Sequence, residues 1–152
     1  MKLNITINNI KKTLDIAPGD ILLDVLRREG YYGVKKGCGQ GECGACTVLI
    51  NGAAYKSCLV LAGIAEGKEI TTIEALGNPD NLHPIQKAFL EAGAVQCGFC
   101  SPGMMLSAKA LLDKNPGPTE NEIKKALDGN LCRCTGYVKI IKAVKLVSKD
   151  IN

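Results

Sequence analysis

Eight cysteines, four in each half of a 152-residue chain, constrain this sequence more than any other feature. The chain does not need them for stability, because 46% hydrophobic residues over this length can already bury a core. Only 4% of the residues are aromatic, so the emphasis on cysteine is unusual. We infer that the fold brings two groups of thiols together for a shared purpose.

The first twenty residues, MKLNITINNIKKTLDIAPGD, lack the apolar segment and the small-residue cleavage site of a secretory signal. No later run approaches membrane-spanning length, so we expect no membrane partner. These features predict a cytoplasmic protein. In a reducing cytoplasm, grouped cysteines bind metal or do redox chemistry more often than they form disulfides.

The formal net charge of +4 counts all eight thiols as neutral. A [2Fe–2S] unit held by four thiolates carries about −2, so two such units would bring the protein close to neutrality. The charge therefore gives no reason to expect a nucleic-acid partner.

Hydrophobic periodicity predicts mainly strands in the first half of the chain. Alternating residues and Asn-rich or Asn-Gly turns indicate two hairpins. A helix is expected to begin at Asp20 as its N-cap and to end at Gly30. The predicted strands are 2–8, 11–16, the hairpin 47–57, and 69–76.

A turn-rich stretch at 77–81 precedes a second half that has helical periodicity. Thr119 and Glu122 have capping-box spacing at the start of one of these helices. The predicted helices are 83–93, 101–115, 119–129 and 136–150.

The first cysteine group comprises Cys38, Cys43 and Cys46 in the segment GCGQGECGAC, and Cys58 beyond it. This is C-x4-C-x2-C with a distant fourth cysteine, the spacing of plant-type [2Fe–2S] proteins. The interleaved glycines permit positive φ and let backbone N–H groups approach sulfur. Four thiolates also suit zinc, but the four-residue gap and the glycine-rich loop favour the larger iron–sulfur core.

The second group comprises Cys97 and Cys100 in QCGFC, and Cys132 and Cys134 in NLCRCTGY. Residues two apart share no helix face, so the last pair is predicted to lie in a loop whose two thiols converge on one bound group. Spacing alone leaves a second iron–sulfur cluster, structural zinc and a redox C-x2-C open. The lone histidine, His83, is interpreted as a surface or capping residue.

Three segments, GVKKGCGQGECGACTVLING, AVQCGFCSPGM and NLCRCTGY, resemble signatures of the small iron–sulfur subunit of the molybdenum hydroxylases. That family includes xanthine dehydrogenase, aldehyde oxidoreductase and the carbon monoxide dehydrogenase small chain, and the resemblance extends over nearly the whole sequence. Ser101 stands where threonine is common, and we expect its hydroxyl to remain available for capping the helix.

The resemblance implies an α+β fold: a plant-type β-grasp ferredoxin domain over residues 1–76, then a four-helix [2Fe–2S]-binding domain over 77–152. Two complete ligand sets are implied, one in each domain. They are Cys38, Cys43, Cys46 and Cys58 for the first cluster, and Cys97, Cys100, Cys132 and Cys134 for the second.

In the family, the helical-domain cluster lies beside the molybdopterin of a large subunit, and the ferredoxin-domain cluster faces the FAD of a medium subunit. Gln96 and Cys134 match positions that contact the pterin. The resemblance thus implies an electron-transfer subunit of an oxidoreductase that hydroxylates an aldehyde or an N-heterocycle such as a purine. Electrons would pass singly from molybdenum through the helical-domain cluster and the ferredoxin-domain cluster to flavin.

No acid/base or nucleophile constellation stands out, so we predict no catalytic residue in this chain. Because the sequence stops after the helical segments, molybdopterin and FAD are expected on partner chains, in a hetero-oligomer such as a dimer of heterotrimers. The alternative is a free-standing two-cluster ferredoxin.

Overall fold

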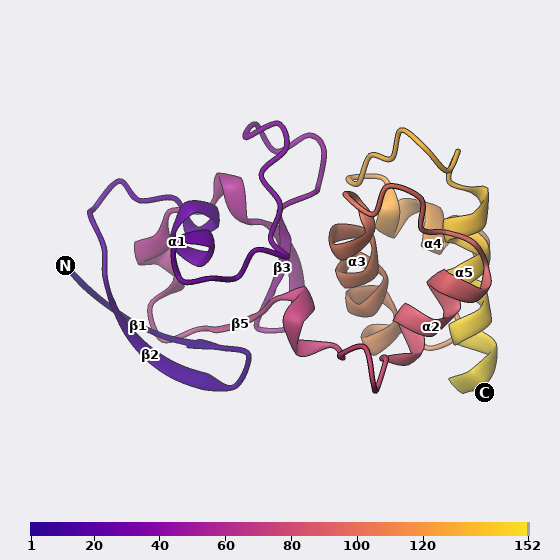
Figure 1. The fold of residues 1–152 in the computed structure, drawn as a ribbon. Coiled ribbons are helices and arrows are strands. Elements are labelled where there is room, and N and C mark those ends of the chain that lie inside the picture. The colour runs from indigo at the N-terminus through magenta and orange to yellow at the C-terminus, as the bar shows by residue number, and fades with distance from the viewer. Residues whose placement is uncertain (152) are drawn as a thin grey trace.

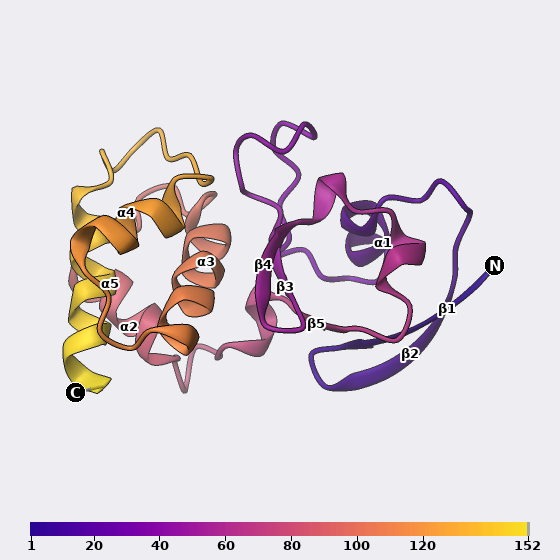
Figure 2. The same cartoon turned by 180° about the vertical axis from the view of Figure 1, so that it is seen from behind.

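The computed structural model describes residues 1–151, with side chains to Ser148. A sheet domain and a helical domain lie side by side (Figures 1 and 2), which gives the two-domain α+β fold that the sequence predicted. The predicted boundary after residue 76 falls between the third 3₁₀ helix and α2. The last residue of the predicted second domain, 152, lies outside the described residues.

The sheet domain is a five-stranded sheet in the order β2-β1-β5-β3-β4, packed against one helix. Strands β1 and β5 pair in parallel and the other pairs are antiparallel. Its elements are β1 (Lys2–Ile7), β2 (Ile10–Asp15), α1 (Leu22–Arg28), β3 (Thr47–Ile50), β4 (Ala53–Lys56) and β5 (Glu69–Thr71), with 3₁₀ helices at Ser57–Leu59, Ala62–Ala65 and Ile73–Ala75.

Both predicted hairpins are present. They turn on Asn8 and Asn9 and on Asn51 and Gly52, all four with positive φ. Asparagine tolerates this conformation better than most residues, which is why the turns could be located from sequence.

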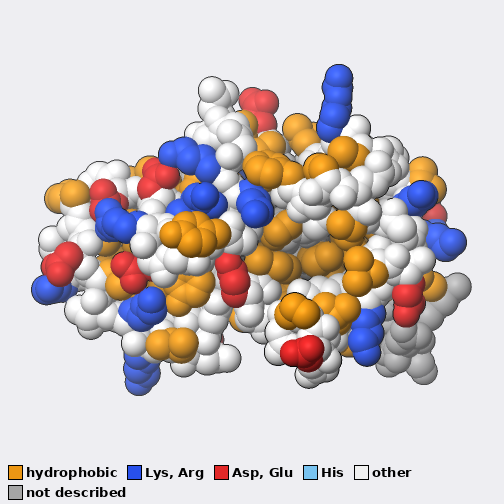
Figure 3. All heavy atoms as spheres, viewed as in Figure 1, with side chains coloured by type: hydrophobic (Ala, Val, Ile, Leu, Met, Phe, Trp, Pro, Cys, Tyr) orange, Lys and Arg blue, Asp and Glu red, His pale blue; other side chains and the backbone are white. Residues whose placement is uncertain are grey.

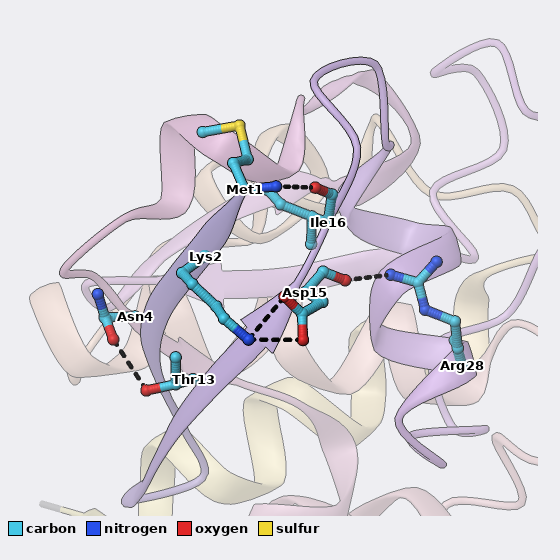
Figure 4. Close-up of polar contacts among 7 residues, drawn as sticks. All are labelled: Met1, Lys2, Asn4, Thr13, Asp15, Ile16 and Arg28. Atoms are coloured by element: carbon cyan, nitrogen blue, oxygen red, sulfur yellow. Dashed lines mark hydrogen bonds and ion pairs between the residues drawn. The ribbon is translucent and has the colours of Figure 1, made fainter.

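The hairpin β1–β2 is fastened at its open end, as Figure 4 shows. The Met1 amino group donates to the Ile16 carbonyl oxygen at 2.7 Å, and the Lys2 ammonium lies 2.7 Å from the Asp15 carboxylate. The Arg28 guanidinium donates to the Asp15 carbonyl at 3.2 Å. These contacts fix the end of α1 against the hairpin.

Two predictions in this domain were wrong. Helix α1 has Ile21 as its N-cap, because the Asp20 carboxylate turns back to accept from the Ala17 N–H and the Arg28 guanidinium. The strand predicted over 69–76 ends at Thr71, where the chain tightens into the third 3₁₀ helix on its way to the helical domain.

The helical domain contains α2 (Pro84–Glu91), α3 (Ser101–Lys114), α4 (Glu120–Leu127) and α5 (Val138–Ile151). These helices surround a core that includes Phe89, Met104, Ile123 and Ile140, all fully buried. No helix among the described residues is long and apolar enough to cross a membrane.

Capping boxes begin two of these helices. The His83 ring nitrogen Nδ1 accepts from the Ile85 N–H at 3.2 Å, which confirms the capping role predicted for this histidine. Thr119 and Glu122 form the predicted reciprocal pair at the start of α4.

The two domains meet where α3 packs across the sheet domain beside β3 (Figure 1). Leu49, Leu106 and Ala110 form a small buried cluster there, with Ile73 and Leu76 against its edge. The two cysteine-bearing loops also meet, because the Leu131 N–H donates to the Cys43 carbonyl oxygen at 2.8 Å.

Candidate metal centres

The first thiol set is built on the loop that precedes β3. Three backbone donors surround the Cys38 sulfur: the N–H groups of Gln40, Glu42 and Cys43 lie 3.3, 3.3 and 3.4 Å from its Sγ. Gly39 and Gly41 have φ of 68° and 79°, which lets the loop curl around the sulfur. The N–H groups of Cys43, Gln40 and Glu42 lower the pKa of the Cys38 thiol to about 6. This position favours a thiolate, the form that ligates metal.

Cys46 and Cys58 form the inner half of this set. Both are buried, with 3% and 8% of their surfaces exposed, and their thiols lie within hydrogen-bonding reach of each other. Burial, followed by the neighbouring Cys46, raises the pKa of the Cys58 thiol to about 11. Binding of a metal at this pair must therefore displace protons.

The second set joins the start of α3 to the loop between α4 and α5. Cys97 and Cys134, both exposed, lie within hydrogen-bonding reach of each other, and so do the partly buried Cys100 and Cys132. Burial and then Cys132 raise the pKa of Cys100 to about 12. In the first set, the Cys38 N–H donates to the Cys43 sulfur at 3.4 Å and the two thiols pair, so each set consists of two pairs. Among the described residues, no three Cys, His, Asp or Glu side chains meet at one point suited to a single ion.

Thr135 and Tyr137 shape the C-x-C loop. The Thr135 hydroxyl and N–H approach the Cys132 sulfur at 3.1 and 3.4 Å. Burial opposes ionisation of Cys132, but the two Thr135 hydrogen bonds, together with the Cys134 N–H and the Cys100 thiol, lower the pKa of the Cys132 thiol. The Tyr137 hydroxyl oxygen accepts from the Cys132 N–H at 3.0 Å, and Tyr137 itself has a positive φ of 70°.

The other residues singled out in the sequence near the second thiol set are partly exposed and partly buried. Gln96 lies exposed directly before Cys97, and Arg133 is exposed between the two cysteines of its loop. The Ser101 hydroxyl is buried and has no hydrogen-bond partner among the described residues, so the expectation that it caps the helix was wrong. Cys100 holds the N-cap position of α3 without a side-chain capping bond.

Two residues close to the thiols were missed by sequence reasoning. Asn130 is buried between the domains, and the Lys56 ammonium donates to the Gly41 carbonyl at 2.6 Å. The only signal for Asn130 was its place two residues before Cys132, and a lysine at the end of a strand carried no signal at all.

Large apolar side chains remain exposed beside both sets. Leu59 is 63% exposed and lies against Gly41, and Phe99 is 47% exposed between Cys97 and Cys100. A groove of about 300 Å³ lies between α2 and the start of α3. Its lining residues include Leu90 and Pro102. In the face shown in Figure 3, apolar side chains gather over the helical half beside the domain junction. Exposed apolar surface of this kind marks interaction sites.

Family models match both domains. The model described as a 2Fe-2S iron-sulfur cluster binding domain matches residues 5–73, and the model described as a [2Fe-2S] binding domain matches 72–145. The two together cover nearly the whole chain, one on each thiol set.

Similar proteins of known name agree with these models. The chain is 51% identical to the nicotinate dehydrogenase small FeS subunit of Eubacterium barkeri, over 94% of this chain and 92% of that protein. It is 49% identical to the xanthine dehydrogenase iron-sulfur-binding subunit of Escherichia coli O157:H7, over 91% and 89%. The chain therefore belongs to the family of small [2Fe–2S] iron–sulfur subunits of the molybdenum hydroxylases.

Solved structures show the same fold. Quinoline 2-oxidoreductase from Pseudomonas putida 86 contains a chain that matches with a TM-score of 0.93 and 43% identity, over 98% of this chain and 94% of that one. Aldehyde oxidoreductase from Desulfovibrio gigas matches with a TM-score of 0.96 and 44% identity. All of this chain is covered in that match, but it spans only 17% of the aldehyde oxidoreductase chain.

Proposed function

We propose that this chain carries electrons between a molybdopterin-binding large subunit and an FAD-binding medium subunit while the complex hydroxylates an aldehyde or an N-heterocycle. Each thiol set would hold one [2Fe–2S] cluster, which supplies exchange of one electron at a time. The ligands would be Cys38, Cys43, Cys46 and Cys58 in the sheet domain, and Cys97, Cys100, Cys132 and Cys134 in the helical domain.

The observation that carries this proposal is the pairing of the thiols. Each set has an inner pair against the domain core and an outer pair at the surface. Two pairs of thiolates suit two bridged irons, because each iron takes two of them. Eight free cysteines also suit a reducing compartment, and we propose the cytoplasm as the location.

The outer thiol pairs indicate which surfaces the partner subunits would contact. Gln96 and Cys134 are exposed beside the helical-domain set, where we propose that they contact the molybdopterin of the large subunit. The apolar Leu59 and Phe99, each next to a thiol set, support docked subunits over a freely diffusing carrier.

The first test is composition. Protein isolated anaerobically from its source should contain about four iron and four acid-labile sulfide per chain, with molybdenum and flavin on co-purifying chains. The same iron and sulfide without partner chains would favour a free-standing ferredoxin. Zinc without visible absorption would refute the electron-transfer role.

The ligand assignment is tested by removing one inner cysteine at a time. Cys46→Ser should abolish the electron paramagnetic resonance (EPR) signal of one reduced cluster, and Cys100→Ser that of the other, each with about half of the iron lost. Loss of both signals in either variant would contradict independent ligand sets.

The pterin contact is tested in the assembled complex. We expect Gln96→Ala to slow turnover, whereas the matched change Asn121→Ala on the exposed face of α4 should not. Unaltered turnover in the Gln96 variant would remove this residue from the site.

A further inference from the structure

A single buried amide connects the two thiol-bearing loops. Asn130 is 5% exposed and lies two residues before Cys132. Its Nδ2 donates to the Gly44 carbonyl at 3.1 Å and to Thr47 Oγ1 at 3.4 Å, both in the sheet domain. Its Oδ1 accepts from the Ser107 hydroxyl of α3 at 2.7 Å. One side chain thus hydrogen-bonds both domains.

The next residue continues the same connection. The Leu131 N–H donates to the Cys43 carbonyl at 2.8 Å. Cys43 and Gly44 belong to the first thiol loop, while Asn130 and Leu131 lead directly into the second. Two consecutive residues of one loop therefore hold two consecutive residues of the other.

The backbones of the two loops and of α3 approach one another closely around Asn130. A Cβ at Gly44 would lie 2.4 Å from the Gly129 carbonyl oxygen and 2.6 Å from Asn130 Nδ2. A Cβ at Gly103 would lie 2.3 Å from the Gly44 carbonyl oxygen. Main chain thus packs on main chain here, and the Asn130 amide adds its side-chain hydrogen bonds at the same contact.

The chemistry of the amide matches its surroundings. The site requires a donor toward the Gly44 carbonyl and an acceptor toward the Ser107 hydroxyl. An uncharged amide supplies both. A carboxylate in the same place would set an oxygen against the Gly44 carbonyl and leave a charge in a buried position. The apolar cluster around Leu49 and Leu106 would still hold the domains together.

We infer that Asn130 is a positioning residue that sets the distance and orientation between the two thiol sets. This inference rests on the proposed function, since the distance matters only if both sets hold clusters. Its substitution should alter the relative placement of the clusters without removing either one.

The experiment measures magnetic coupling between the two reduced clusters. Dipolar coupling falls with the inverse cube of the separation, so EPR of the fully reduced holo-protein is sensitive to small displacements. Asn130→Asp keeps the side-chain size and removes the donor, and Asn121→Asp makes the same change on the exposed face of α4. Iron and sulfide content are measured on every sample.

We expect Asn130→Asp to weaken the dipolar coupling between the two reduced clusters or to broaden the range of its values. Both cluster signals and the iron content should stay at the wild-type level. Asn121→Asp should match wild type. Wild-type coupling in the Asn130 variant would overturn the inference. Absence of two cluster signals in the wild-type protein would instead refute the proposed function, so the two failures are distinguishable.

A second variant keeps the inference testable if Asn130→Asp does not fold. Ser107→Ala removes only the hydroxyl that orients the Asn130 amide, and we expect a smaller change in coupling in the same direction. If Asn130→Asp does not fold and Ser107→Ala has wild-type coupling, the inference is also overturned.

Discussion

Replacement of Gly103 by alanine tests how closely the two domains approach. In an ordinary helix interior this change stabilises by about 1 kcal/mol, because alanine has the better helix propensity. At Gly103 the added Cβ would lie 2.3 Å from the Gly44 carbonyl oxygen, far inside van der Waals contact. Overpacking against backbone that cannot rotate away costs roughly 2–3 kcal/mol, toward the upper part of the usual range. The sum is a loss of about 1–2 kcal/mol, opposite in sign to the helix-propensity effect.

Urea unfolding followed by far-ultraviolet circular dichroism measures this loss. With a slope of about 2 kcal/mol per molar urea, the unfolding midpoint should fall by roughly 0.5–1 M. Because release of a bound cluster can make unfolding irreversible, wild type and variant are compared after the same anaerobic incubation.

Gly19→Ala is the matched control. Gly19 has no atom within 4 Å of its would-be Cβ and does not have positive φ, so the substitution should leave the midpoint unchanged or raise it. A Gly103→Ala variant as stable as wild type would show that the domains can move apart at no cost, and the argument from close backbone approach would fail.

Three further predictions concern the loops and the surface. Tyr137→Phe removes the hydroxyl that accepts the backbone N–H at the start of the C-x-C segment, so unfolding experiments should show a loss of about 1 kcal/mol. Lys56→Met removes a cation bonded to the first thiol loop, so EPR-monitored redox titration should give a more negative potential for the sheet-domain cluster alone. Lys145, then Lys124, lower the pKa of Glu120 to about 2, so NMR titration should find it well below the usual 4.5. The stabilisation from this depressed pKa is present above pH 4.5 and is lost as the pH falls toward 2.

Each of these predictions has a control and a contrary result. Tyr55→Phe removes an exposed hydroxyl and should not change stability; equal losses in both tyrosine variants would contradict the loop argument. Lys11→Met removes one charge on an exposed strand, and an equal potential shift there would mean that only net charge matters. Lys145→Met should raise the Glu120 pKa, whereas Lys142→Met on the same helix should leave it where it is.

The cysteine pattern predicted which thiols the fold brings together, because cysteine spacing reflects local chain geometry. A loop that curls around Cys38 needs glycines at fixed places, and these are visible in the sequence. The capping role of His83 was likewise local, since it depends on residues within one turn of helix.

The failures came from contacts between segments distant along the chain. Asp20 is a good N-cap by residue type, but the Arg28 guanidinium, eight residues later, helps hold its carboxylate away from the helix. Asn130 acts through Gly44, which lies 86 positions away. No periodicity or spacing rule encodes such a contact, so it could be found only in three dimensions.

If each thiol set holds a cluster, its division into an inner and an outer pair also bears on how that cluster is assembled and lost. Cys46 and Cys58 are closed off by the core, whereas Cys38 stands open to solvent. Iron delivered to the folded protein would reach Cys38 first and the buried Cys46 and Cys58 afterwards. Oxidants and chelators would reach a bound cluster from the same side, and a partner subunit docked there, as we propose, would shield the cluster from both.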